Sequence, residues 1–369
     1  MGGHAFSATL PEAAFPRIPP PVYEALKKQI TPKLESLFQV VSTPAEAPQK
    51  ADHGDVDFLV CQPLEELTHK EIQALLAADH VLPAHQTSSY ALRVERGAWG
   101  PLGLEEQEDT ARTAAEAAGS SNIYYQVDVH VCPDRSDWER VHFFHSYGDL
   151  GMILGLIVRN NGLTLGTKGL KLPNVPHPPI DLCDSMDEIM KYMGLSMDRW
   201  KAGFTTALEV FEWVGTSTFF DPTTFQSRGT GIKKVKPERK MYGNFVEWAE
   251  AQPPKTTGVS GMDKTARAQH ALVRFGKKEE YDRIKQEDAD RELIKAYFNG
   301  HNIREWTGIP ADNWWDVKKV SEGVRAELGG PAGILALLEK GDERALIPVV
   351  RRVYKALEIE AITAGVRNL

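Results

Sequence analysis

The run His53-Gly54-Asp55-Val56-Asp57-Phe58-Leu59-Val60 decides the fold of the first half of the chain. Its second part is apolar and rich in strand-forming residues, which predicts a buried strand over residues 56–61. Side chains two residues apart in a strand point to the same face, so Asp55 and Asp57 project together as the chain enters this strand. Gly54 lets another group approach the backbone closely. We therefore expect the two carboxylates beside a rigid sheet, although an Asp-x-Asp at a strand start is also common as a solvated turn.

A second strand is predicted over residues 123–132, where apolar and polar residues alternate. Asp128 lies on the polar face of this strand. If the two strands are neighbours, Asp55, Asp57 and Asp128 converge on one side of a sheet, and like charges at such distances need compensation. Mg²⁺ prefers hard oxygen ligands and keeps positions for water and phosphate. The three acids are therefore candidate ligands for Mg²⁺ or Mn²⁺, which can activate an attacking hydroxyl and stabilise a pyrophosphate leaving group.

The rest of the pattern predicts an α/β (α+β) front half and a helical back half. Residues 103–121 are acidic and Ala-rich, and we expect an exposed excursion between two strands there. The Pro-rich residues 173–179 are expected to be a linker. The predicted domains are thus residues 1–172, a mixed sheet with flanking helices, and residues 181–369, an all-helical domain. Helices are expected over residues 22–41, 68–78, 137–145, 150–159, 197–213, 239–251, 277–298, 315–328 and 345–364, and a hairpin over residues 163–172.

Composition restricts the class of protein. The chain of 369 residues has 43 Lys+Arg against 51 Asp+Glu, so any phosphate-binding surface must be a local patch. Three cysteines are too few for a disulfide framework or a structural zinc site, and Cys61 and Cys132 are interpreted as small buried hydrophobes. His130, His142 and His145 are interpreted as structural rather than as zinc ligands. The longest apolar segment, residues 150–158, is too short to cross a bilayer, and we see no secretory signal. We expect a location in the cytoplasm, with the nucleus as the alternative, and no membrane partner.

Three motifs together resemble the signature of the polymerase-β-type nucleotidyltransferase superfamily: Gly2-Gly3, Gly54-Asp55-Val56-Asp57 and Val127-Asp128-Val129. The likeness is closest to phage and fungal nucleotidyltransferase-like proteins, which also show a segment like Ser146-Tyr147-Gly148-Asp149-Leu150-Gly151. It covers about the first 170 residues and implies a nucleotidyltransferase-type mixed sheet.

The resemblance also implies site residues. Asp55, Asp57 and Asp128 would be catalytic metal ligands, with Asp128 also the base toward the acceptor hydroxyl. Gly2 and Gly3 would lie against the phosphates of an NTP. The superfamily keeps its glycine and aspartate motifs much closer together than Gly3 and Asp55 are here. Either residues 5–21 are an insertion before the first helix, or the glycine pair is coincidental.

Basic residues are candidates for binding the triphosphate and the acceptor. Lys50 lies just upstream of the acids, and Lys168 lies in the hairpin after the third acid. Residues 228–240 form the densest positive run and are followed by aromatic residues, which suits an RNA backbone with stacked bases. A solvated loop leading into a helix is the alternative for this run. Residues 298–309 resemble the tail region of tRNA nucleotidyltransferases; Trp306, Trp314 and Trp315 are interpreted as core.

These observations predict a metal-dependent nucleotidyltransferase that moves a nucleoside monophosphate from an NTP to a hydroxyl acceptor and releases pyrophosphate. The expected acceptor is the 3′ end of an RNA, with tRNA among the candidates. Two alternatives stay open: an inactive scaffold of the same fold that binds RNA or a protein, and a metal-dependent nuclease. The sequence contains no Walker A loop, no Gly-x-Ser-x-Gly elbow and no Gly-x-Gly-x-x-Gly after a strand. It leaves the oligomeric state open.

Overall fold

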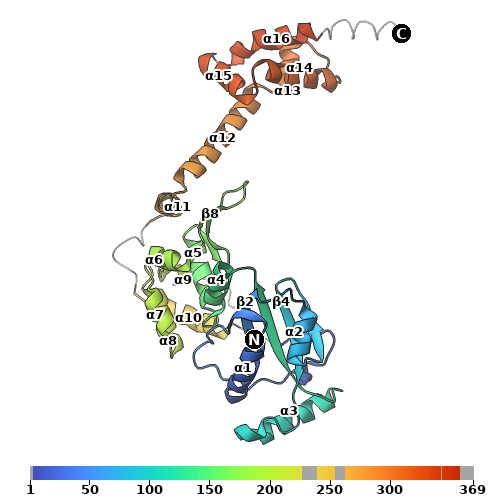
Figure 1. Ribbon diagram of the computed structural model, residues 1–369. Helices are drawn as coiled ribbons and strands as arrows, with labels where there is room; N and C mark the ends of the chain where they lie inside the picture. Colours follow the sequence, from blue (N-terminus) through green and yellow to red (C-terminus); the bar gives the residue numbers. More distant parts are fainter. Residues whose placement is uncertain (1–2, 227–238, 254–261, 342, 358–369) are drawn as a thin grey trace, which may run out of the picture. The chain divides into compact units, whose positions relative to one another are not determined.

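The computed structural model describes residues 3–226, 239–253, 262–341 and 343–357 (Figure 1). By their contacts they form two units, Met1–Phe275 and Gly276–Leu369. The first unit contains a five-stranded mixed sheet with flanking helices and the second is helical, which confirms the predicted fold class. The unit boundary lies far beyond the predicted linker at residues 173–179. The reason is that the helices after that linker pack on the front half: the Tyr147 hydroxyl, for example, donates to the Trp200 carbonyl, 3.1 Å away.

The main sheet has the strand order β1-β2-β5-β4-β3. Strands β2 and β5 are parallel, and the other neighbours are antiparallel. Both strands predicted to carry the aspartates are therefore present, and they are neighbours in the sheet. The strands are β1 Phe38–Ser42, β2 Asp55–Pro63, β3 His80–Leu82, β4 Thr87–Arg93 and β5 Tyr124–Cys132.

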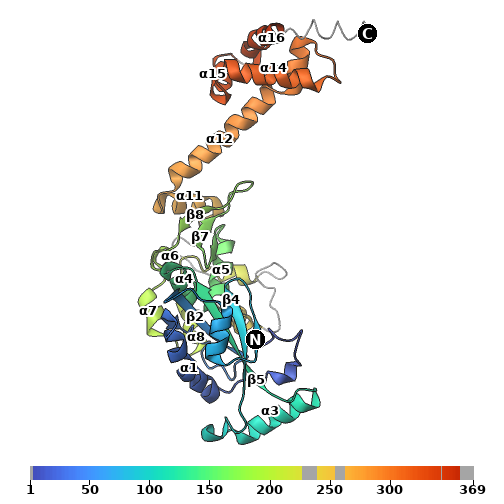
Figure 2. The same cartoon turned by 45° about the vertical axis from the view of Figure 1, so that its right-hand side comes forward.

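The two faces of this sheet differ in polarity. On one face the buried side chains of β2 and β5, such as Val56, Phe58 and Val127, pack against helices α1 (Pro20–Glu35) and α2 (His69–Leu76). On the opposite face both strands begin polar and end apolar, and α4 packs on the apolar end. Figure 2 shows α4 and α1 near β2. On this opposite face, the polar residues at the beginning of β2 and β5 therefore lie beside the apolar core and not within it.

Two local predictions are corrected. The predicted helix over residues 22–41 ends at Glu35, and residues 38–42 pair with β2 as an edge strand. Residues 103–121, expected to be an exposed excursion, contain helix α3 (Glu105–Ala117). Its buried Glu108 accepts hydrogen bonds from the backbone N–H groups of Gly97 and Trp99, so the helix is fastened to the unit.

The predicted hairpin after the third acid is present, and it belongs to a second sheet of order β6-β7-β8. No pattern in the sequence predicted the third strand, which begins directly after the Pro-rich stretch. The bounds are β6 Thr164–Gly166, β7 Gly169–Leu172 and β8 Ile180–Cys183. The other helices of this unit are α4 Arg135–His145, α5 Leu150–Asn160, α6 Met186–Met193, α7 Met197–Ala202, α8 Ala207–Gly215, α9 Thr223–Gln226, α10 Lys240–Glu250 and α11 Lys264–Arg274.

The second unit has its own apolar core, built from four of its helices and the end of the fifth. Trp306 packs against that core as expected, but Trp314 and Trp315 are 58% and 72% exposed and are not core residues. Both follow a helix N-cap, where the chain turns their side chains outward. The helices are α12 Lys278–Tyr297, α13 Gly300–Thr307, α14 Trp314–Glu327, α15 Pro331–Gly341 and α16 Leu346–Ala356.

Within the described parts of the chain, no single helix has the length and apolar composition needed to span a bilayer. Helices α4 and α5 reach that composition only as a pair, and they meet at an angle of 94°.

Candidate active site

The three predicted aspartates lie on one face of the main sheet. Asp57 and Asp128 are in-register partners on the parallel strands β2 and β5, and Asp55 precedes Asp57 by two residues. Neighbours in register share a face, and so do residues two apart. All three side chains are half-buried. The carboxylate oxygens of the three aspartates do not all lie within 4.8 Å of one another. Among the described residues, a different group of possible metal ligands meets that distance, and it is considered below.

The electrostatics of this trio favour a bound cation. Burial, and then the charges of Asp55 and Asp128, raise the pKa of Asp57 to about 8. Burial also raises the pKa of Asp128 to about 6, and that of Asp55, although the Gly3 N–H opposes the shift at Asp55. Carboxyl groups with raised pKa values are held in a place where their charge is poorly compensated. The donor set, all carboxylate oxygens, fits Mg²⁺ or Mn²⁺.

The N-terminal segment lies across the start of the two strands. The Gly3 N–H donates to Asp55 Oδ2 at 3.1 Å, and the Ala5 N–H donates to the side chain of Gln126 at 3.0 Å. The Gln126 amide in turn donates to Asp128. Gly3 therefore lies at the aspartates despite its distance from them in sequence. Its N–H is engaged by a carboxylate here, and Gly2 lies outside the described residues.

A cavity of about 830 Å³ opens beside Asp57. Four cationic side chains line it together with this acid: Arg17, Lys50, Arg239 and Lys240. Lys50, a predicted triphosphate-binding residue, lies in this wall. Three further acids, Glu46, Asp52 and Asp149, also line the cavity, so its wall carries charges of both signs. A pocket of this size can hold a nucleotide.

Several of these cations are held by acids of the surrounding loops. Arg17 pairs with Asp52 at 2.7 Å, and Arg239 pairs with the buried Asp149 at 2.6 Å. Lys50 pairs with Glu46. These ion pairs hold the cationic side chains in place in the absence of an anion. Binding of an anion would therefore cost less side-chain conformational entropy.

Glu46 is the centre of a network that sequence inspection missed. It accepts a hydrogen bond from the Tyr23 hydroxyl at 2.6 Å and lies 3.3 Å from His53 Nδ1. The rings of Tyr23 and His53 stack at 3.7 Å. Burial alone would raise the pKa of Glu46, but His53 and Lys50 lower it to about 2. The network joins α1 to the loop that carries Lys50; in the sequence only His53, which precedes the aspartates, gave a signal.

The segment that begins at Ser146 forms the facing wall. Tyr147 and Gly148 both have positive φ, 60° and 66°, and a side chain at Gly148 would come within 2.8 Å of Ala47. The Tyr147 N–H donates a hydrogen bond to the Ala45 carbonyl, which joins this turn to the loop between β1 and β2 that carries Lys50. The following residue is Asp149, the partner of Arg239. This motif of the superfamily resemblance thus lines the cavity.

One predicted anion-binding residue, Lys168, is not at the cavity, and only the end of the basic run at residues 228–240 is described. Lys168 Nζ lies 2.6 Å from Asp137 Oδ1 on α4 and does not line the cavity. Its hairpin position places it against that helix. Most of the basic run at residues 228–240 falls at residues 227–238, which lie outside the described residues. Its last two members, Arg239 and Lys240, do reach the cavity wall.

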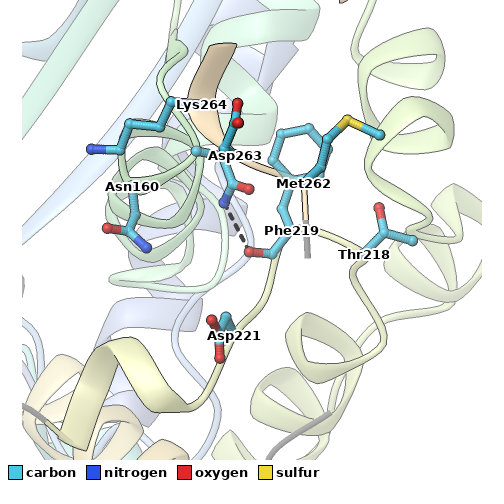
Figure 3. A pocket seen from close by; sticks show the side chains of 8 residues that line it. Asn160, Thr218, Phe219, Asp221, Met262, Asp263 and Lys264 are labelled. Atoms are coloured by element: carbon cyan, nitrogen blue, oxygen red, sulfur yellow. Dashed lines mark hydrogen bonds between the residues drawn. The ribbon is translucent and has the colours of Figure 1, made fainter. Parts of the chain in front are cut away.

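A smaller pocket of about 270 Å³ lies near the end of α5 and the start of α11 (Figure 3). There the Asn161 amide donates to the Phe219 carbonyl at 2.9 Å. Its acids serve local structure: Asp221 accepts from the Thr223 N–H, and Asp263 caps α11. We assign this pocket no chemistry.

Comparison with protein-family models and with curated proteins found no match to this chain. Function therefore has to be inferred from the geometry and electrostatics of the site.

Proposed function

We propose that this protein is a nucleotidyltransferase that uses Mg²⁺, or Mn²⁺, to transfer a nucleoside monophosphate from an NTP to a hydroxyl acceptor. The observation that carries the proposal is the set of Asp55, Asp57 and Asp128 on one sheet face, beside a cavity with four cationic side chains. The raised pKa values of the three acids support it, because a divalent cation would compensate their charge.

Each group has a role in this proposal. A bound Mg²⁺ would neutralise triphosphate charge and favour loss of pyrophosphate. Lys50, Arg239 and Lys240 would bind the phosphate oxygens. The acceptor oxygen would form a bond to the α-phosphorus while the bond from that phosphorus to the oxygen of the β-phosphate breaks, and the hydroxyl proton would pass to Asp128. A positioned carboxylate is one of the side chains that can accept a proton in such a step.

The proposed acceptor is the 3′ end of an RNA, with tRNA among the candidates. Arg239 and Lys240, at the cavity wall, are the end of a longer basic run in the sequence. In the second unit the exposed rings of Trp314 and Trp315 lie beside Arg304 and Lys318. Exposed aromatic rings next to cations are a common way to bind single-stranded RNA. A cytoplasmic or nuclear location would give access to such an acceptor.

The test is transfer of label. The protein is incubated with total RNA, Mg²⁺ and each α-labelled NTP in turn, and the RNA is separated by length. We expect lengthened, labelled RNA with the wild type, and no label with Asp57→Asn or Asp128→Asn. Asp79→Asn is the matched control, because Asp79 is an acid before β3 that pairs with Arg93 away from the cavity.

The two alternatives predict different outcomes of the same experiment. A nuclease would shorten RNA in a reaction that needs the metal but no NTP. An inactive scaffold would leave RNA length unchanged, and calorimetry would detect no binding of NTP with Mg²⁺. Transfer that persists in both Asp57→Asn and Asp128→Asn would refute the assigned site.

A further inference from the structure

The polar face of β5 continues past Asp128 to a second cluster. His130 and Cys132 follow at two-residue steps and therefore lie on the same face. Asp137, in the first turn of α4, lies over them. One ligand atom from each of these three residues lies within 4.8 Å of the other two. Cys132 and Asp137 are each only 1% exposed, so the cluster is enclosed between the sheet and the helix.

Two polar atoms in this enclosure have no hydrogen-bond partner. They are His130 Nε2 and Asp137 Oδ2, and both are buried. The opposite atom of each group is held: His130 Nδ1 lies 2.7 Å from the Thr87 hydroxyl, and Asp137 Oδ1 accepts from Lys168 at 2.6 Å and Arg140 at 3.2 Å. An unpaired buried polar atom costs free energy, so two at one place need an explanation.

The geometry of both groups agrees with a ligand role, because each keeps one buried atom without a partner while its other polar atom is engaged. The partners on Nδ1 and Oδ1 also fix both groups, as outer partners do at metal centres.

We propose that His130, Cys132 and Asp137 form a binding site for Zn²⁺, distinct from the aspartate trio. The three residues offer one nitrogen, one sulfur and one carboxylate oxygen as donors. This donor set suits Zn²⁺ and does not suit Mg²⁺. The Cys132 thiol would lose its proton to solvent as the sulfur–zinc bond forms. The site joins β5 to α4 directly beyond Asp128. It does not depend on the proposed transferase activity.

This proposal revises two interpretations made from the sequence. The sequence pattern favours Cys132 as a small buried hydrophobe, and the zinc alternative combines His130 with His142 and His145. The structure instead groups His130 with a cysteine and an acid, because the strand repeat places residues 130 and 132 on one face while α4 presents Asp137. His142 and His145 are outside the group.

The test uses the full-length protein, stripped with chelator and titrated with Zn²⁺ alone or Co²⁺ alone. We expect one Zn²⁺ per chain. X-ray absorption of the zinc form should show one sulfur at about 2.3 Å and lighter ligands at about 2.0–2.2 Å. The Co²⁺ form should show a thiolate-to-metal band in the near ultraviolet.

Variants identify the ligands. Cys132→Ser should abolish the thiolate band, and Asp137→Asn should weaken Zn²⁺ binding by more than the roughly 10–100-fold that loss of an outer partner costs. Cys183→Ser, which removes a thiol on β8, is the control and should keep the band. Asp128→Asn should also keep it, which separates this site from the aspartate trio.

The opposing explanation is that Asp137 serves only as the ion-pair partner of Lys168 and Arg140. It predicts that the stripped wild type binds no Zn²⁺, and that result would overturn the proposal. Zinc bound without a sulfur ligand, or a thiolate band that survives in Cys132→Ser, would overturn it too. If a variant loses its circular dichroism, the absorption spectrum of the wild type decides alone.

Discussion

The position of the Asp57 carboxyl group lowers the stability of the folded chain when this group is ionised. Its pKa is raised to about 8 in the folded chain, by burial first and then by Asp55 and Asp128, whereas an unfolded chain gives about 3.9. The ionised form therefore destabilises the fold. This cost is absent below about pH 3.9, grows as the pH rises, and is complete above about pH 8. Residues that serve a ligand often carry such a cost.

The first prediction concerns Asp57→Asn, which removes this charge and keeps the shape of the side chain. We expect the metal-free variant to unfold at a higher temperature than the wild type at pH 8, with a smaller difference at pH 5. Each kcal/mol regained corresponds to roughly 2–4 °C in a unit of this size. Calorimetric scans at the two pH values measure it, with Asp79→Asn as control. A variant less stable than the wild type at pH 8 would contradict this account of the acid cluster.

The second prediction concerns Mg²⁺ itself. Protons and Mg²⁺ compete for the same carboxylates, so added Mg²⁺ should raise the Tm more at pH 8 than at pH 5.5, by the usual linkage of ligand binding to stability. Chelator should reverse the rise, and Asp57→Asn should lose most of it. Equal Tm shifts at both pH values would indicate that Mg²⁺ binds elsewhere.

The third prediction concerns Gly3, whose backbone has φ of +84° and packs against Gly54. A Cβ at Gly3 would lie 2.5 Å from the Gly54 carbonyl oxygen, which is backbone and cannot move aside. Gly3→Ala should therefore break the hydrogen bond to Asp55 and lower the Tm. Gly103→Ala is the matched control, because Gly103 also has a positive φ, +72°, but nothing lies near its Cβ position. Thermal unfolding should show a larger decrease in Tm for Gly3→Ala than for Gly103→Ala. Equal decreases would mean that only the backbone strain of Ala at a positive φ acts at both positions.

At the scale of elements, α3 shows why an acidic, polar stretch can still be ordered. Arg112 pairs with Glu108 at 2.7 Å, both nearly buried, and also donates to the carbonyls of Val94 and Glu95. Glu108 accepts backbone N–H groups of the preceding loop. The helix is thus held by a satisfied polar network together with a few apolar contacts.

The fourth prediction follows from that network. Arg112→Met leaves the buried Glu108 carboxylate without a counter-charge and should cost about 3–5 kcal/mol. The double variant Glu108→Gln with Arg112→Met should lose less, because no buried charge remains. Arg96→Met is the control: Arg96 pairs with Glu116 at the surface, and such pairs contribute about 0–1 kcal/mol. Urea midpoints of the four proteins measure these differences. A cost for Arg112→Met no larger than that for Arg96→Met would show that the pair does not hold α3.

At the scale of the whole molecule, each unit has a core of its own. The core of the second unit runs from Ile294 to Val353 and includes residues of α12 to α16. A unit with its own buried core is expected to fold independently.

The fifth prediction is that residues 276–369 fold as a separate fragment. Its circular dichroism should be helical, and it should unfold in one cooperative thermal transition. Residues 1–275, expressed alone, should keep the Mg²⁺ response expected above. A fragment 276–369 that shows no cooperative transition would mean that its core needs the first unit.

The alternation of apolar and polar residues determined by itself that residues 123–132 form a strand and that Asp128 shares a face with His130. Asp55 and Asp57 were found in the same way. These are local properties, because the two-residue repeat of a strand is independent of the rest of the fold.

Only the tertiary structure decided that the two strands are parallel neighbours in register, that Gly3 returns to Asp55, and that Lys168 binds Asp137. It also decided the unit boundary and the network around Glu46. Each of these features depends on contacts between segments far apart in the chain, and no local pattern encodes which segments meet. Many strand pairings satisfy the same alternation, and the burial of apolar side chains selects one of them.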